Sequence, residues 1–146
     1  MVTGFEGLTY ELNKFEKEHL VPLLVRSWER RWLEERGTVY MKEIVLGLRN
    51  HYTRHTTDPK ELKQVLKKIS EPRIRKVIHH IRVNGLVPNL IATSKGYFKT
   101  ENPEKLKKYI ESCWERSNSF KEVALSMENQ YKKLINQITT QTQTQS

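Results

Sequence analysis

Six lysine and arginine residues against a single glutamate lie between residues 70 and 100, where the sequence is SEPRIRKVIHHIRVNGLVPNLIATSKGYFKT. Cations of this kind neutralise the phosphates of a nucleic acid, and arginine also donates paired hydrogen bonds to the edge of a guanine. The spacing predicts a basic helix over 71–84 and then a β-hairpin with Lys95 at its tip. Because a helix fits the major groove of duplex DNA, this segment predicts a DNA-binding surface.

The predicted contacts come from both the helix and the hairpin. The candidate DNA-binding residues are Arg73, Arg75, Lys76, His79, Arg82, Lys95, Tyr97 and Lys99. At 100° per residue the apolar positions of the helix form one stripe, made of Ile74, Val77, Ile78 and Ile81. This stripe should pack inward. We therefore expect Arg75, Lys76 and His79 to be better placed for DNA than Arg73.

Other reactive side chains lack the spacing of a catalytic or metal site. His51 and His55 suit one helix face, but no CxxC accompanies them, so no zinc site is predicted. The sequence contains no Gly-rich phosphate loop, HExxH or GxSxG. Cys113 falls on an apolar seam and is interpreted as a packing residue. We therefore expect no enzyme activity, no metal and no small-molecule cofactor.

The net charge is confined to the middle of the chain. The 146 residues carry a formal net charge of +9 and have a pI of about 9.7. Residues 38–100 contain 13 Lys and Arg against 4 Asp and Glu, which accounts for all of the excess. Such a concentration indicates a polyanionic partner, either a nucleic acid or an anionic membrane surface, and it is typical of a nucleic-acid footprint.

Several features favour the cytoplasm. No apolar run approaches the ~20 residues that a membrane span needs. The N-terminal residues lack the basic-then-apolar pattern of a signal peptide. Cys113 is the single cysteine, so it forms no internal disulfide, which fits a reduced compartment. We expect a cytoplasmic protein with no membrane partner.

The first predicted helix extends from residue 8 to residue 35, after a flexible lead-in over residues 1–7. Pro22 should kink or split it, because proline removes a donor and disfavours helix at the residue before it. Trp28 and Trp32 lie one turn apart on one face. Packing is the favoured interpretation of this pair, and a platform for stacking bases is the alternative.

A strand and two further helices should lead to the basic helix. Residues 38–40 are β-prone. Residues 41–52 have helical spacing, in which Gly47 is interpreted as a close crossing with a neighbouring helix. Asp58 has the character of an N-cap and starts a helix over 59–68.

The basic helix should end at Gly85, since glycine adopts the left-handed backbone of a helix terminus. Residues 90–93 and 97–100 are predicted as two strands. The tight turn between them requires a positive φ, which Gly96 should supply.

Apolar or small side chains alternate by four and three residues along the C-terminal part of the chain. They are Leu106, Ile110, Cys113, Ser117, Phe120, Ala124, Met127, Tyr131, Leu134 and Ile138. This spacing predicts a coiled coil or a long docked helix. We expect residues 102–136 to form a helical extension that pairs two copies of the chain, with a break near Asn118 as an alternative. Residues 137–146 should form a disordered polar tail.

The pattern from Ile74 onward resembles a known family. The residues that carry the likeness are Ile74-Arg75, Ile78, Ile81-Arg82, Gly85, Leu90-Ile91-Ala92, Ser94-Lys95-Gly96-Tyr97, Tyr109-Ile110, Ser112 and Arg116, and Val21–Arg31 is similar too. They resemble winged-helix proteins encoded by phages and prophages of gut bacteria. The resemblance implies a winged helix-turn-helix and a DNA partner in a bacterial host cell. The chain departs from the pattern between Tyr52 and Ser70, where the extra helix lengthens the link between two helices that usually form a tight turn.

The sequence therefore predicts a mainly α fold with a small β-hairpin, namely a winged helix-turn-helix domain over 8–101 with a C-terminal helical extension. The predicted function is non-catalytic binding of double-stranded DNA in regulation, replication or host takeover. Two alternatives remain open. One is a protein–protein interaction module that acts through its helices. The other is binding of single-stranded nucleic acid or RNA through Trp28, Trp32, Tyr97 and Phe98.

Overall fold

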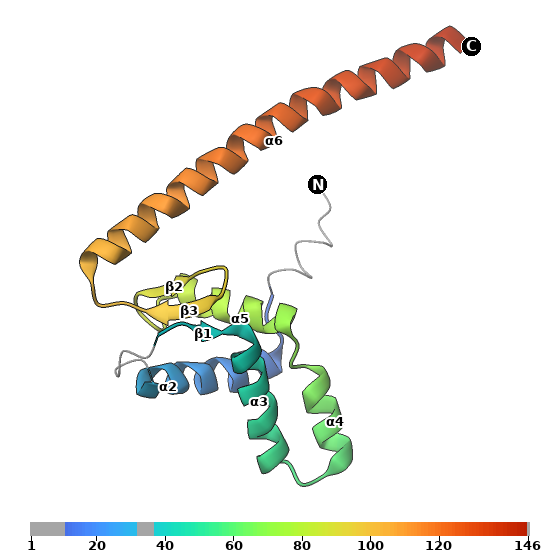
Figure 1. Cartoon of the computed structure of the whole chain (residues 1–146). Helices are drawn as coiled ribbons and strands as arrows, with labels where there is room; N and C mark the ends of the chain where they lie inside the picture. The colour runs from blue at the N-terminus through green and yellow to red at the C-terminus, as the bar shows by residue number, and fades with distance from the viewer. Residues whose placement is uncertain (1–10, 32–36, 146) are drawn as a thin grey trace. The chain divides into compact units, whose positions relative to one another are not determined.

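A computed structural model describes residues 11–31 and 37–145 of the chain. The chain divides into two units between Glu101 and Asn102, and each is described by itself. The first unit is mainly helical with a small antiparallel sheet, and the second is a long helix (Figure 1). The prediction of a mainly α fold with a small β-hairpin is confirmed at this level.

A capping box begins the first described helix. The side-chain oxygen Oδ1 of Asn13 accepts a hydrogen bond from the backbone N–H of Glu16 at 2.8 Å. In return, Oε1 of Glu16 accepts one from the backbone N–H of Asn13 at 2.9 Å. This exchange satisfies two donors that have no partner within the helix. The backbone then passes through the π-helical turn η1 (Glu16–Leu20) into α2 (Val21–Arg31).

Pro22 interrupts the hydrogen-bond pattern of this helix without breaking its helical path. Val21 keeps helical angles, with φ −59° and ψ −54°, although helix is disfavoured before a proline. The π-helical turn directly before α2 takes up the irregularity, as π-bulges do elsewhere. The predicted residues 8–10 and 32–35, Trp32 included, lie outside the described part of the chain.

The strand β1 (Val39–Tyr40) and the helix α3 (Met41–His55) follow where they were predicted. The helix α3 runs on through His55, three residues beyond the predicted helical stretch of 41–52. The close crossing predicted at Gly47 is wrong, because nothing lies within 4 Å of the position that a Cβ would take there.

Side-chain caps start the next two helices, and the cap at Asp58 was predicted. Asp58 accepts a hydrogen bond at 3.1 Å from the backbone N–H two residues on and caps α4 (Pro59–Lys67). Ser70 accepts one at 3.4 Å from the backbone three residues on and caps α5 (Glu71–Val83). Both helices have a proline in their first turn. Its missing N–H costs no hydrogen bond there, because the N–H groups of a first turn have no acceptor within the helix.

The end of α5 also follows the prediction. Gly85 has a φ of +63°, and the backbone N–H of Leu86 donates to the carbonyl of Ile81 at 3.0 Å. This is the left-handed termination that glycine favours. Val87 then turns back into the core and is 3% exposed, whereas Leu86 stays at the surface.

The hairpin consists of β2 (Leu90–Ala92) and β3 (Gly96–Lys99), with Ile91 opposite Phe98. The strand β1 pairs with the other edge of β3, so the antiparallel sheet has the order β1-β3-β2.

The reason for a glycine at position 96 differs from the prediction. The described residues with positive φ are Gly85 and Asn89, so the positive φ expected at Gly96 is wrong. A Cβ at Gly96 would instead lie 2.0 Å from the carbonyl oxygen of Val39. Glycine is needed because β1 approaches β3 closely, and not because of the conformation of the turn.

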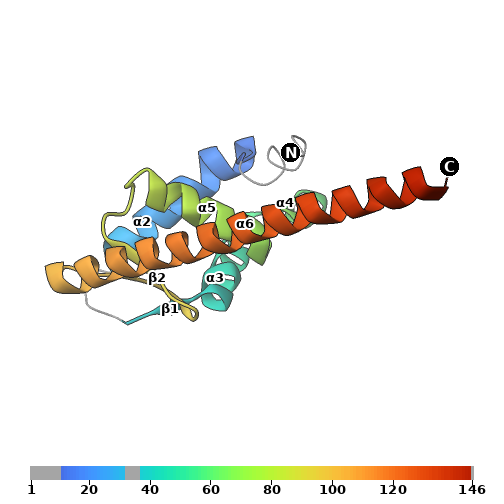
Figure 2. The same ribbon diagram turned by 90° about the horizontal axis from the view of Figure 1, so that it is seen from above.

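The core lies among α2, α3, α5 and the sheet (Figures 1 and 2). The predicted stripe of α5 is fully buried, and its members are Ile74, Val77, Ile78 and Ile81. Trp28 is 3% exposed, and its ring centroid lies 6.3 Å from that of Tyr97. The packing interpretation of Trp28 is therefore confirmed.

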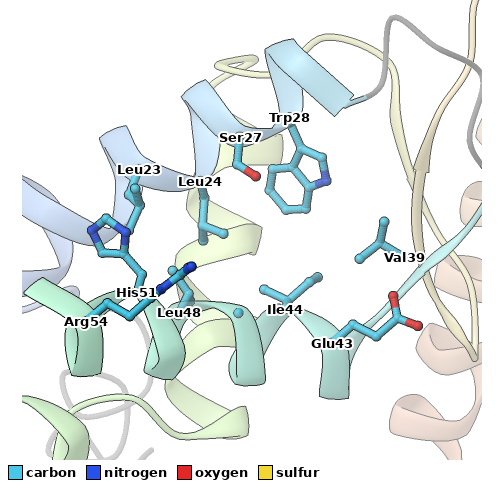
Figure 3. Close-up of a pocket in the computed structure, with 11 residues that line it drawn as sticks. Leu23, Leu24, Ser27, Trp28, Val39, Glu43, Ile44, Leu48, His51 and Arg54 are labelled. Carbon is cyan, nitrogen blue, oxygen red and sulfur yellow. The ribbon is translucent and has the colours of Figure 1, made fainter.

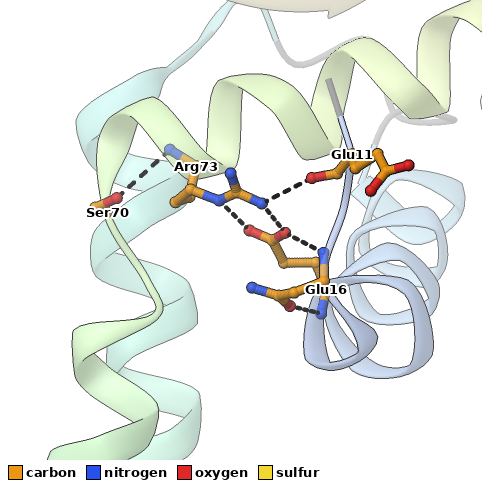
Figure 4. A network of polar contacts seen from close by, with 5 residues as sticks. Glu11, Glu16, Ser70 and Arg73 are labelled. Carbon is orange, nitrogen blue, oxygen red and sulfur yellow. Dashed lines mark hydrogen bonds and ion pairs between the residues drawn. The ribbon is translucent and has the colours of Figure 1, made fainter. Parts of the chain in front are cut away.

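Glu16 is a charged side chain with no exposed surface. Arg73, in the first turn of α5, donates from Nε to Oε2 of Glu16 at 2.8 Å and from Nη2 to Oε1 (Figure 4). Its Nη2 also donates to the carbonyl of Glu11 at 3.2 Å. The hydrogen bond to Glu16 raises the pKa of the Arg73 guanidinium. This ion pair fastens the start of α5 to the first helix.

The second unit is α6 (Pro103–Gln145), a continuous helix of 43 residues with no break near Asn118. The helix includes residues 137–145, for which a disordered tail was expected. There the hydroxyls of Thr140 and Thr142 donate to carbonyls four residues earlier, at 2.8 and 2.9 Å. Adding residues to an existing helix needs no new nucleus, which outweighs their polar composition.

We predict that Glu16→Gln lowers the free energy of unfolding by about 3 kcal/mol, because it leaves a guanidinium without its buried counter-charge. Urea denaturation measures the change. The control is Glu71→Gln, which removes the partner of Arg75 from an exposed pair whose side chains are 60% and 45% exposed. It should cost below about 1 kcal/mol. Equal losses in the two variants would contradict this assignment.

The two glycines described above should respond to alanine in opposite ways. Gly96→Ala should destabilise the first unit by about 2 kcal/mol or more, because its Cβ meets the backbone of β1. Gly47→Ala should stabilise it by about 1 kcal/mol, since alanine favours an exposed helix interior. Thermal unfolding of the two variants checks the sign of each effect.

Candidate nucleic-acid interface

The helices α4 and α5 are joined by only three residues, 68–70. Ile69, in the middle of this turn, is 2% exposed and anchors it in the core. The extra helix was expected to lengthen the link before the basic helix. The structure places α4 between α3 and α5, where it packs on α3 and runs in a clearly different direction from α5 (Figure 1). Short connections of this kind are typical of helix-turn-helix units.

Arg49 of α3 holds this turn in place. Its Nη1 donates to the carbonyl of Leu66 at 2.9 Å and to the carbonyl of Ile69 at 3.2 Å. The last carbonyls of a helix lack partners within it and carry partial negative charge, so a guanidinium satisfies them well. Sequence reasoning missed this role. The residue lies 17 positions before Leu66, and no local signal connects the two.

The outer face of α5 carries three of the predicted contact residues. Arg75 and His79 are exposed and Lys76 is half-buried, while the opposite stripe faces the core. Arg75 forms an ion pair with Glu71 one turn earlier, at 2.7 Å. Because this pair is solvated, it costs little to exchange Glu71 for a phosphate.

Two further predicted residues of α5 hold the helix in the fold. Arg73 is engaged with buried Glu16, as described above. Arg82 donates from Nε to the carbonyl of Leu90 at 3.2 Å, which ties the end of α5 to the first strand of the hairpin. Both guanidinium groups therefore position α5.

The hairpin presents its predicted residues unequally. Lys95 is exposed at the tip, where Thr93 Oγ1 accepts hydrogen bonds at 3.2 Å from the backbone of Lys95 and of Gly96. Lys99 is half-buried opposite Leu90. Tyr97 is only 9% exposed because it packs on Trp28. The structure thus leaves Lys95 as the main cation at the tip.

A set of exposed lysines on α4 was not among the predicted contact residues. Lys60, Lys63 and Lys67 are all exposed and follow each other by three and four positions. Residues with this spacing share one face of a helix. Lys68 differs, since its ammonium lies 5.1 Å from the ring centroid of Phe15. The i, i+3, i+7 pattern was the available signal for this lysine face.

A small groove lies between α2 and α3 (Figure 3). Its volume is about 180 Å³, and its floor is apolar, with Leu24, Trp28 and Ile44 among the lining residues. Ligand pockets for small molecules are typically larger, about 300–1,000 Å³. We therefore assign no small-molecule site to it.

His51 lines the same groove and contacts His55, with the two rings tilted by 49° and their centroids 4.6 Å apart. Desolvation lowers the pKa of His51, and the positive charges of His55, Arg54 and Arg26 lower it further. His51 is thus a weak candidate for holding a phosphate near neutral pH. Within residues 11–31 and 37–145, no group of three or more His, Cys, Asp or Glu side chains is arranged to hold a metal.

None of the helices in the described part of the chain is both long enough and apolar enough to cross a membrane. Comparisons of the chain with protein-family models, with curated proteins and with solved structures find no match.

We predict that Arg49→Met destabilises the first unit by about 2 kcal/mol, because two carbonyls lose a charged donor. Hydrogen exchange should accelerate most in the turn at residues 68–70. The matched control is Arg54→Met, on the exposed face of the same helix, which should change stability by less than about 0.5 kcal/mol. Unchanged exchange in the turn of the Arg49 variant would contradict the assignment.

Proposed function

We propose that the first unit is a winged helix-turn-helix that binds double-stranded DNA without catalysis. The observation that carries the proposal is the three-residue turn that connects α4 to α5, with exposed cations on both helices. The apolar stripe of α5 is fully buried, so its basic face is held outward as a rigid surface.

The order of the elements supports the winged-helix part of the proposal. A helix, a strand and further helices lead to α5, and the hairpin of β2 and β3 follows directly, with β1 closing the sheet against β3. This is also what the resemblance to phage winged-helix proteins implies. The proposal includes a phage origin and action in the host cytoplasm.

The two helices take different parts in the proposed complex. The helix α5 enters the major groove, where Arg75, Lys76 and His79 contact base edges and nearby phosphates. The lysine face of α4 crosses the backbone, as the first helix of such a pair does, and neutralises phosphates. Lys95 at the hairpin tip contacts the adjacent backbone or minor groove.

The other predicted residues act indirectly in this proposal. Arg73 and Arg82 fasten the two ends of α5, through Glu16 and through the carbonyl of Leu90. Tyr97 supports the hairpin from within the core. Their substitution should lower the stability of the fold together with DNA affinity.

The single-strand alternative is weakened by burial. Stacking of bases needs exposed rings, but Trp28 and Tyr97 are 3% and 9% exposed and pack on each other. The protein–protein alternative is favoured by a different feature, the exposed apolar side chains of α6.

Fluorescence anisotropy with a labelled random-sequence duplex tests the proposal. The variant Arg75→Gln/Lys76→Gln/Lys95→Gln should bind at least tenfold more weakly at ~150 mM salt. Its plot of log affinity against log salt should be shallower by about 2 to 3, because fewer counterions are released. The variant Lys60→Gln/Lys63→Gln/Lys67→Gln should show a similar loss of slope.

The matched control is Lys105→Gln/Lys108→Gln/Lys133→Gln, which removes the same charge from exposed positions of α6. It should retain most of the affinity. If the wild-type chain fails to bind duplex DNA at ~150 mM salt, or if the control loses as much affinity as the α5 variant, the proposal is wrong. Tighter binding to a single strand than to the duplex would favour the alternative.

A further inference from the structure

The helix α6 exposes large apolar side chains along most of its length. Those more than 40% exposed are Ile110, Trp114, Phe120, Val123, Leu125, Met127, Tyr131, Leu134, Ile135 and Ile138. The helix has 43 residues and is about 64 Å long at 1.5 Å per residue. Except for Leu125, these side chains lie on the predicted 4–3 seam or directly beside it. Helices with such a stripe are stabilised mainly by packing it against a partner.

We propose that α6 pairs with α6 of a second copy, and that the two helices run antiparallel. The argument rests on side-chain size along the seam. In the first half of the seam Cys113, Ser117 and Ala124 are small, whereas Leu106, Ile110 and Phe120 are large. In the second half the seam positions are all large, and are Met127, Tyr131, Leu134 and Ile138. A parallel pair would place each small residue against its own copy and leave gaps in the core.

An antiparallel pair brings the small half of one helix against the large half of the other. One register matches the four layers from Cys113 to Ile138. Ala124 faces the partner's Met127, and Phe120 faces the partner's Tyr131. Ser117 then faces the partner's Leu134, and Cys113 faces the partner's Ile138. Each small residue packs against a large one, and the aromatic rings of Phe120 and the partner's Tyr131 contact each other.

The positions that flank the seam agree with the same register. Lys121 lies opposite the partner's Glu128, which gives an attractive pair on each side of the two-fold axis. Trp114 lies opposite the partner's Ile135, so two exposed apolar side chains cover each other. In a parallel pair Lys121 would instead face the partner's Arg116, which is repulsive.

The resulting interface is two-fold symmetric and closed, with its axis between residues 125 and 126. The two first units are attached at opposite ends of a helical rod. Their attachment points are separated along the rod by about 45 residues of rise at 1.5 Å each, or about 68 Å. The inference is independent of DNA binding, since it uses α6 alone.

Sedimentation of the full chain at micromolar concentration should show a dimer. Phe120→Glu and Leu134→Glu place a charge in the seam and should each shift the chain to a monomer. Leu125→Glu is the matched control, because Leu125 is as exposed as Leu134 but lies off the seam, and it should remain dimeric. A monomeric wild-type chain, or a control that dissociates as readily as the seam variants, overturns the proposal.

Disulfide formation distinguishes the two orientations. In the antiparallel register Cys113 and its symmetry copy lie about 37 Å apart along the rod, from about 25 residues of rise. Mild oxidation of the wild-type chain should therefore give no covalent dimer on a non-reducing gel. Ile138→Cys should give one, through Cys113. The double variant Ile138→Cys/Cys113→Ser should lose it. Efficient cross-linking of the wild-type chain would establish a parallel pair and overturn the proposal.

A charge exchange provides a second test that introduces no cysteine. Lys121→Glu should weaken the antiparallel dimer at least several-fold, since two carboxylates then face each other. Adding Glu128→Lys should restore it. In a parallel pair Lys121→Glu should instead tighten the dimer, because the new carboxylate would attract the partner's Arg116. Tighter dimerisation of Lys121→Glu would overturn the proposal.

Discussion

The buried carboxylate of Glu16 is the constraint on which the placement of α5 depends. A carboxylate without solvent is costly by several kcal/mol unless a cation and further hydrogen bonds compensate it. Arg73 provides the cation and the backbone of Asn13 provides a donor, so the first helix and α5 meet in one arrangement. The apolar stripe of α5 adds the burial energy, but apolar contact alone tolerates sliding. The directional ion pair sets the register.

The basic residues of α5 fall into two groups, those bonded within the fold and those exposed to solvent. Arginines that bond to Glu16 or to the carbonyl of Leu90 are part of the fold, whereas Arg75 and His79 are directed to solvent. A count of basic residues treats all of these cations alike. The exposed charge extends instead onto α4, whose lysine face adds to that of α5. The turn between α4 and α5 keeps its form because Arg49 satisfies its carbonyls.

The two units bury apolar surface in different ways. In the first unit, helices and a sheet enclose a core whose central side chains are fully buried. In the second unit the 4–3 seam of α6 is exposed along its length. A single helix cannot bury its own apolar stripe. The order of small and large side chains along the stripe therefore specifies which surface can pack against it. The small residues in the first half of the seam and the large residues in the second half complement each other, which is why an antiparallel copy fits.

Much of the architecture followed from local signals in the sequence. Asp58 and Gly85 marked helix ends because capping involves atoms only a few residues apart. The stripe from Ile74 to Ile81 identified the buried face of α5, since helical periodicity is itself local. The basic outer face and the hairpin with Lys95 at its tip followed from the same reasoning.

Tertiary structure decided which charged and special residues serve the fold. Glu16 and Arg73 are 57 positions apart, and Arg49 lies 20 positions before Ile69, so no spacing rule connects them. Gly96 is a glycine because β1 approaches it, although the turn chemistry of the sequence suggested a positive φ. The sequence by itself determined where helices begin, end and turn their apolar faces, because those preferences act within a few residues. Only the folded chain decided which cations are bound inside it and which remain at the surface, because that depends on partners brought together from distant segments.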